Sequence, residues 1–191
     1  YEAQEFVGSE VRILSDTEIE GYTRIRNGWN FSTAYTVYFH ARFDTPAESF
    51  GTWKDDRKAP GVTEQADNNS KCGAWFTFNT NGHKTVKVKV GISYMGYGKA
   101  KENIRELGSW DIEDARKKAV DTWNGILSKI DVDTPDTDAR KIFYSSVYRI
   151  FLQPSDYAGE NPMWISDEPY YGDYHAIWDT FRATHPFINL F

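Results

Sequence analysis

The spacing of apolar residues changes once along this 191-residue sequence, close to Gly96. Before that point apolar and polar residues alternate, as in residues 35–43, where the odd positions are apolar or aromatic. A period of two is that of a half-buried β-strand. Afterwards apolar residues recur at steps of three and four, most clearly over residues 111–129, which is the spacing of an amphipathic helix. Strands followed by helices exclude an alternating parallel sheet and predict a multi-domain α+β chain with a boundary near residue 95.

The alternating region contains several segments that we expect to form strands, at residues 11–25, 35–43, 49–53, 72–79 and 86–92. Residues that favour turns separate these segments, at positions 27–28, 45–46, 59–61 and 81–82. The last of these pairs, Asn81-Gly82, is typical of a tight hairpin turn. Short strands separated in this way predict an antiparallel β-sandwich over residues 1–95.

Helices are expected in the second half of the chain. The strongest pattern covers residues 111–129, and a shorter helix over residues 99–107 ends at Gly108. A third helix is expected over residues 136–153, with Thr134 as N-cap and Pro135 at the first helical position. We therefore assign residues 96–133 to a helical linker and residues 134–191 to a second, helical domain. Residues 154–175 are longer than an ordinary connection, which favours a functional loop.

Composition excludes several classes of function. Lys and Arg total 22 against 28 Asp and Glu, and the resulting net charge of −6 disfavours a nucleic-acid partner. No apolar run approaches the roughly 20 residues that a membrane span needs. The single cysteine, Cys72, excludes an intramolecular disulfide. The first residues include no leader-like stretch and the last five lie in an apolar run, so we expect a segment of a longer protein.

Residues with functional chemistry are densest at positions 170–186. There Trp178 offers a flat apolar face beside the carboxylate of Asp179, which can accept hydrogen bonds from hydroxyls, and this pair suits a sugar. The 7 Trp, 12 Tyr and 12 Phe residues of the chain also suit stacking on sugar rings. The alternative is structural: Asp179 caps a helix that begins at Thr180, and Trp178 anchors that helix.

Other candidate groups have simpler interpretations. The four histidines lack the spacing of a zinc motif, and His185 before Pro186 is interpreted as a packing or capping residue. Neither Ser145-Ser146 nor Cys72 has the sequence context of a nucleophile. Glycoside hydrolysis needs two carboxylates across a pocket. The acids of the long loop are interpreted as solvated: Asp167, Glu168 and Asp173.

The run Trp178-Asp179-Thr180-Phe181-Arg182, followed by His185-Pro186, resembles family 92 of the glycoside hydrolases, the calcium-dependent exo-acting α-mannosidases. The resemblance extends over most of the chain, through motifs at residues 18–21, 35–39, 49–53, 90–94, 100–103, 110–111, 123–124 and 143–148. Residues 158–174 match the family poorly.

This resemblance implies an antiparallel β-supersandwich, a helical linker and the first helices of an (α/α)6 barrel. It implies an inverting enzyme that removes terminal α-mannose from glycans, similar to an α-1,2-mannosidase, and a periplasmic or extracellular location. Trp178 and Asp179 are implied to bind the terminal mannose. The catalytic residues and the Ca²⁺ ligands are expected outside this sequence, in the remainder of the same protein, so this segment alone should be inactive.

Two alternatives stay open at this point. One is a non-catalytic carbohydrate-binding β module with a helical extension, which the strands and aromatic residues also permit. The other is a helical-barrel glycosidase of different specificity.

Overall fold

A computed structural model describes residues 4–27, 30–82, 84–163, 166, 168–172 and 177–190, with side chains left undescribed at 30–32. The chain divides into two compact units, Tyr1–Trp110 and Asp111–Phe191. Over the described residues, no helix is long and apolar enough to cross a membrane.

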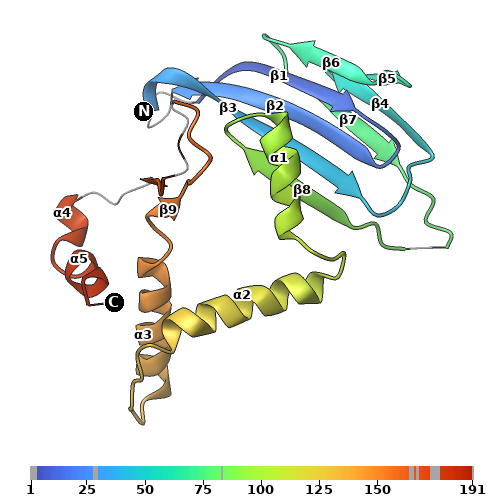
Figure 1. Cartoon of the computed structure of the whole chain (residues 1–191). Helices are drawn as coiled ribbons and strands as arrows, with labels where there is room; N and C mark the ends of the chain where they lie inside the picture. Colours follow the sequence, from blue (N-terminus) through green and yellow to red (C-terminus); the bar gives the residue numbers. More distant parts are fainter. Residues whose placement is uncertain are drawn as a thin grey trace. The chain divides into compact units, whose positions relative to one another are not determined.

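Two antiparallel sheets form the first unit (Figure 1). The larger sheet has the strand order β6-β1-β2-β3-β8, where the strands are β1 (Glu5–Ile13), β2 (Glu18–Asn27), β3 (Asn30–Phe43), β6 (Glu64–Asp67) and β8 (Val88–Ser93). The smaller sheet has the order β5-β4-β7, with β4 (Ser49–Lys54), β5 (Arg57–Pro60) and β7 (Cys72–Thr77). The predicted antiparallel strands before residue 95 are therefore confirmed.

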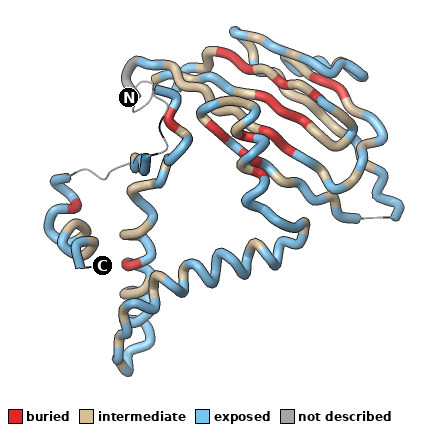
Figure 2. Tube along the Cα trace, viewed as in Figure 1, coloured by how far each residue is buried: buried red, intermediate tan, exposed pale blue. Residues whose placement is uncertain are grey.

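The core of the first unit lies on the odd-numbered face of the larger sheet, because side chains alternate between faces along a strand. Its buried members come from β1, β2 and β3: Val11, Ile13, Ile19 and Ala41. Aromatic side chains of both sheets pack against them, and the ring centroids of Phe43 and Phe76 are 5.0 Å apart. Figure 2 shows that buried residues gather in these strands.

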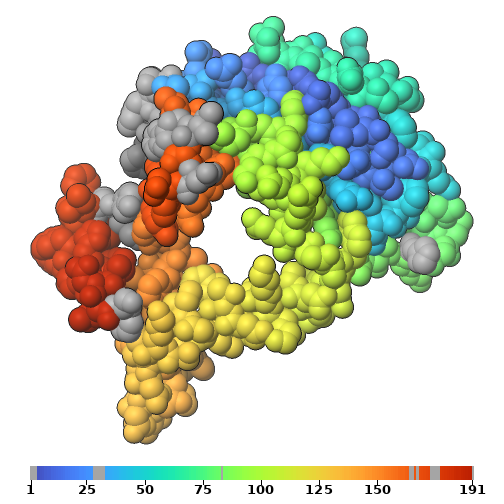
Figure 3. All heavy atoms as spheres, viewed as in Figure 1, coloured from blue at the N-terminus to red at the C-terminus, as the bar shows by residue number. Residues whose placement is uncertain are grey.

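The opposite face of the larger sheet, formed by even-numbered residues of β1–β3 and odd-numbered residues of β8, carries charged side chains. Helix α1 (Tyr97–Asn103) packs over β3 and β8 (Figures 1 and 3). Ala100 of this helix and Ile104 of the following 3-10 turn η1 (Ile104–Glu106) are buried. Gly91 of β8 permits the close approach. A Cβ atom at Gly91 would lie 2.0 Å from the carbonyl oxygen of Ala100.

The second unit is built on helices α2 (Ile112–Leu127) and α3 (Thr137–Ile150). Asp111 caps α2 by accepting a hydrogen bond from the backbone N–H of Glu113. The rings of Trp123 and Tyr148, one from each helix, have centroids 4.3 Å apart. Further along the chain, β9 (Ser155–Asp156) pairs with β10 (Tyr171–Gly172), and two short helices follow, α4 (Ile177–Thr180) and α5 (Thr184–Ile188).

The predicted helices at residues 111–129 and 136–153 are confirmed as α2 and α3. The predicted N-cap of α3 is wrong. Asp136 is the cap, because its side chain accepts hydrogen bonds from the backbone N–H groups of both Asp138 and Ala139. Thr134 accepts a hydrogen bond from the backbone N–H of Asp136, one turn before the helix.

Two predictions about the strands are also wrong. Residues 11–25 are not one strand, because the chain turns after Ile13 and the backbone N–H of Leu14 donates to the carbonyl of Glu18. Asn81-Gly82 does not close a hairpin, since β7 pairs with β4 in one sheet and β8 pairs with β3 in the other. The turn residues at 81–82 therefore did not indicate which strands pair.

Gly91→Ala should destabilise the protein by about 1–3 kcal/mol, because the new methyl group would meet the backbone of α1. Gly98→Ala in α1 is the matched control: its Cβ would have no atom within 4 Å, and alanine favours a helix. Thermal unfolding should place the midpoint of Gly91→Ala several degrees below that of Gly98→Ala. Equal midpoints would contradict the close packing of α1 on β8.

Asp67, at the end of β6, links the two sheets through an ion pair with Lys54 of β4. The Lys54 amine, with the backbone N–H groups of Asn69 and Ser70, lowers the pKa of Asp67 to about 2. A lowered carboxyl pKa stabilises the fold above the unfolded value of about 4, and that contribution is lost as the pH falls toward 2.

Asp67→Asn should therefore lower the thermal midpoint at pH 7 and flatten its fall between pH 4 and pH 2. Asp121→Asn, which removes an exposed ion pair with Lys117 on α2, should change neither. An unchanged acid profile in the Asp67 variant would contradict this role.

Candidate functional site

The Trp-Asp-Thr-Phe-Arg segment folds around one buried residue. Thr180 ends α4 and is 6% exposed. Its Oγ1 lies 2.8 Å from Nε2 of His185 in α5, and this contact joins the two short helices. The ring of Phe187 in α5 in turn lies 6.1 Å from that of Phe151, the C-cap residue of α3. The motif is thus held from its interior side, and His185 is confirmed as a packing residue.

The two predicted sugar-binding residues lie on the solvent side of this motif. Trp178 is 81% exposed and Asp179 is also exposed. A large indole is costly to leave in water, and an exposed aromatic side chain beside a carboxylate is typical of a binding surface. Trp178 and Asp179 are thus two consecutive exposed residues of this chain.

The capping alternative for Asp179 is wrong in its original form. The helix that contains Asp179 begins no later than Ile177, so Asp179 does not precede a helix that starts at Thr180. The N-cap of the next helix, α5, is Ala183, whose side chain makes no capping hydrogen bond. Asp179 is instead the third residue of the single-turn helix α4.

The structure describes only part of the remaining candidates. Glu168 is exposed, and its backbone N–H donates to Oγ of Ser166. The Ser146 hydroxyl donates a hydrogen bond to the carbonyl of Ile142 within α3. Sγ of Cys72 lies 3.2 Å from Oγ of Ser9. Residues Asp167 and Asp173, like His175, lie outside the described residues.

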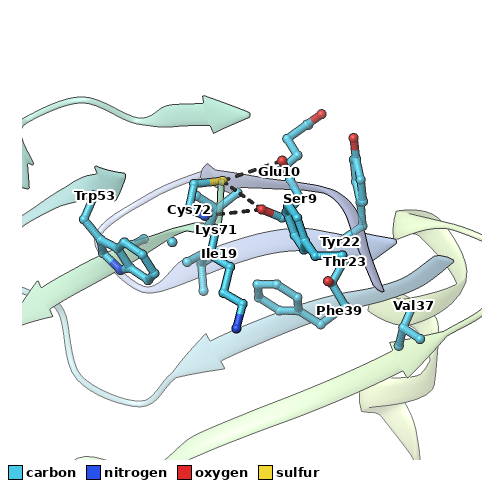
Figure 4. Close-up of a pocket in the computed structure, with 14 residues that line it drawn as sticks. Ser9, Glu10, Ile19, Tyr22, Thr23, Val37, Phe39, Trp53, Lys71 and Cys72 are labelled. Carbon is cyan, nitrogen blue, oxygen red and sulfur yellow. Dashed lines mark hydrogen bonds between the residues drawn. The ribbon is translucent and has the colours of Figure 1, made fainter. Parts of the chain in front are cut away.

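The first unit contains a groove that the sequence analysis did not predict. It has a volume of about 460 Å³ and lies along β7, against the odd-numbered face of the larger sheet. Figure 4 shows Trp53 of β4 and Phe39 of β3 on opposite sides, with Lys71 between them in this view. No local pattern could reveal it, because its walls come from strands of two sheets that are distant in sequence.

Glu10 is the one carboxylate lining this groove, and it is already engaged. Its Oε1 accepts a hydrogen bond from the Tyr97 hydroxyl at 3.1 Å and lies 3.3 Å from Nε of Arg12. Burial and the adjacent Glu10 carboxylate raise the pKa of Tyr97 well above its usual value. A single occupied carboxylate cannot supply the acid and base pair of an inverting hydrolase.

The described residues do not fit a calcium site. No group of three or more His, Cys, Asp or Glu side chains among them could hold a metal ion. Glu18, Glu20 and His40 lie close together, but the two carboxylates contact opposite nitrogens of the His40 ring and do not converge on one point. Calcium needs six to eight converging oxygen ligands.

Comparison with known families defines the class of protein. The family model for the "glycosyl hydrolase family 92 N-terminal domain" matches residues 1–93, and that for the "glycosyl hydrolase family 92 catalytic domain" matches residues 99–191. Together these two domains of one family account for nearly the whole sequence. The chain belongs to glycoside hydrolase family 92.

Solved structures agree with this assignment. A family 92 α-mannosidase from Bacteroides thetaiotaomicron superimposes with a TM-score of 0.81 and 25% identity, over 97% of this chain and 26% of that one. A family 92 inverting mannosidase from B. thetaiotaomicron gives a TM-score of 0.79 and 27% identity, over 95% of this chain and 26% of that one. The chain thus spans about a quarter of the length of these structures.

A curated relative gives a similar result at the level of sequence. The "uncharacterized secreted glycosidase" of Arthroderma benhamiae is 32% identical over 119 residues. The match covers 59% of this chain and 16% of the relative.

Thr180→Val should lower the stability of the motif by about 1 kcal/mol, because it keeps the side-chain shape but removes the hydroxyl that contacts His185. Thr180→Ser keeps the hydroxyl and should preserve more of that stability. Thermal midpoints of the two variants test this. A valine variant as stable as the serine variant would contradict the role of the Thr180–His185 contact.

Proposed function

We propose that this chain forms part of an inverting glycosidase that removes terminal α-mannose from glycans. Family membership supports a glycoside hydrolase, and the two structural neighbours carry the names α-mannosidase and inverting mannosidase. One of them has also been solved in complex with mannoimidazole. The observation in this chain that carries the proposal is the exposed pair of Trp178 and Asp179 in the family motif.

In this proposal Trp178 and Asp179 divide the recognition of one sugar. The indole of Trp178 stacks on the apolar face of the mannose ring, and the Asp179 carboxylate accepts hydrogen bonds from ring hydroxyls. The contact between Thr180 and His185 holds the backbone of the motif in place. Trp178 and Asp179 are therefore positioned without a contact between their own side chains. This arrangement binds and orients a sugar but transfers no proton.

The bond-breaking step needs groups that we place outside this sequence. Inversion requires one carboxyl group to protonate the leaving oxygen and a second to activate water on the opposite face of the sugar. The described residues hold neither such a pair nor a calcium site, so no step is assigned to Ca²⁺ here. We place the catalytic carboxyl pair and the Ca²⁺ ligands in the remainder of the same protein.

Three finer features belong to the same proposal. Residues 1–95 contribute to a β-supersandwich, residues 96–133 to a linker, and residues 134–191 to the first helices of an (α/α)6 barrel. The linkage preference resembles that of an α-1,2-mannosidase. A periplasmic or extracellular location is supported by the relative named as a secreted glycosidase.

The non-catalytic alternative accounts for less of the chain. A carbohydrate-binding β module with a helical extension would explain the sheets and their aromatic residues. It would not explain why residues 99–191 match a catalytic domain. The enzyme is therefore the better interpretation.

Asp179→Asn in the full-length enzyme should separate binding from stability. Asparagine keeps the shape of the side chain but loses its charge, and a hydrogen bond to a charged group contributes about 1.5–3 kcal/mol. We expect kcat/KM for a mannoside to fall roughly ten- to a hundredfold, while the thermal midpoint changes little.

The comparison variant is Asp179→Ala, which removes both the acceptor and any interaction with the α4 dipole, and so should affect activity at least as strongly. Near-normal kcat/KM in the Asn variant would show that Asp179 does not bind sugar.

The 191-residue chain alone should release no mannose and bind no Ca²⁺ with ordinary affinity, because the catalytic pair and the cation ligands are proposed to lie elsewhere. A mannoside release assay and calorimetry with CaCl₂ test this. Turnover that a chelator abolishes would show that the assignment of these groups is wrong.

A further inference from the structure

His40 is a fully buried titratable side chain that the proposed function does not use. It lies on β3, with 0% of its surface exposed, between two glutamates of the neighbouring strand β2. Its Nε2 is 3.0 Å from Oε1 of Glu18, and its Nδ1 is 3.3 Å from Oε2 of Glu20. Both ring nitrogens therefore face carboxylate oxygens.

Counting donors defines the protonation state that suits this geometry. An ionised carboxylate only accepts hydrogen bonds, and a neutral imidazole has one N–H and one acceptor nitrogen. With a neutral ring, one nitrogen lone pair would face a carboxylate oxygen inside the protein, which is unfavourable. An imidazolium ring donates from both nitrogens and satisfies both contacts.

Three carboxylates and three cations form the charged network around His40, and two of the carboxylates contact its ring directly. On the β1 side, Arg12 forms an ion pair with Glu20 and lies 3.3 Å from Glu10. Glu20 is thus paired with Arg12, and a protonated ring would add a second cationic contact to it.

The other glutamate extends the same network to helix α1. Lys101 of α1 lies 3.2 Å from Oε1 of Glu18, and Arg42 of β3 lies 3.7 Å from the same atom. Burial raises the pKa of Glu18, but hydrogen bonds with His40 and Lys101 outweigh burial, so the net pKa is lowered. Tyr97 of α1 lies over Arg12, with the guanidinium carbon 4.1 Å from the ring centroid.

The position of His40 in the sheet places this network where α1 comes closest. The strand register aligns Arg12, Glu20, His40 and Gly91 across four neighbouring strands. Gly91 is the residue at which a Cβ would meet the α1 backbone. Glu18 contacts both His40 of the sheet and Lys101 of α1, and so connects the buried ring to the helix.

We propose that His40 is a proton-operated latch: as an imidazolium it bridges Glu18 and Glu20 and holds α1 on the sheet, and loss of its proton loosens α1. The sign follows from proton linkage. Unfolded histidine loses its proton above about pH 6.5, so a ring that donates from both nitrogens in the folded protein makes the folded state the one that binds more protons. Stability is full below that pH and decreases as the pH rises.

Hydrogen exchange of the α1 backbone amides, expressed as protection factors in the intact protein, tests the latch. Protection of the peptide covering Tyr97–Asn103 should be constant from pH 5.5 to 6.5 and then fall, by at most tenfold per pH unit because one proton is released. His40→Gln removes the titrating group and should make protection independent of pH between 6.5 and 8.5.

Glu20→Gln provides a second test of the His40 proposal if His40→Gln does not fold stably. Its amide can donate to a neutral His40 ring, so the proton is no longer needed and the decline should disappear. His185→Gln, in the second unit, is the matched control and should retain the wild-type decline. Nitrogen chemical shifts of ¹⁵N-labelled histidine should show one doubly protonated ring at pH 7.5, absent in His40→Gln.

Three outcomes would overturn the latch. These are wild-type protection that does not change with pH, an unaltered decline in both the His40 and Glu20 variants, and a neutral His40 ring at pH 7.5. Each of these readouts is independent of catalysis, so a failure here leaves the mannosidase proposal untouched.

Discussion

The first unit depends on a five-stranded sheet whose two faces have opposite chemistry. Odd-numbered residues such as Val11, Ile19 and Ala41 face the smaller sheet and form the apolar core. Even-numbered residues carry charge, yet Glu20 and His40 are buried. Side chains alternate between the two faces of a strand, so the register that places the apolar residues in the core also places their charged neighbours on the opposite face. Ion pairing and the cover of α1 make that charged face compatible with folding.

Sequence periodicity predicted elements better than it predicted their partners. The alternation at residues 35–43 and the helical spacing at residues 111–129 are properties of single segments, and both elements formed. Pairing is a property of the whole sheet. Asn81-Gly82 has hairpin residues, but the strands on either side of it pair with strands of separate sheets. The cap of α3 was misplaced for a related reason, because Thr134 and Asp136 are both good capping residues and only backbone geometry distinguishes them.

The candidate site shows a similar division. Residue chemistry alone left Asp179 between a cap and a sugar ligand, and the structure removes the cap before Thr180 without identifying a ligand. It also shows what no pattern indicated, namely that Thr180 and His185 form the interior of the motif while Trp178 and Asp179 form its surface. The identity of the sugar rests on relatives, because an indole and a carboxylate are compatible with many hydroxylated rings.

The buried His40 network and the exposed Trp178–Asp179 pair follow from one physical rule applied in opposite directions. Removing a charge from water is costly, so a buried charged group requires partners within the protein, and His40 has a carboxylate at each ring nitrogen. An exposed carboxylate has no such requirement and can exchange water for a ligand hydroxyl at little cost. Charges that already have partners therefore stabilise the fold, whereas an exposed carboxylate such as Asp179 can take the recognition role proposed above. This distinction explains why Glu10, although it lines a groove, is a poor candidate for binding sugar: Tyr97 and Arg12 already occupy it.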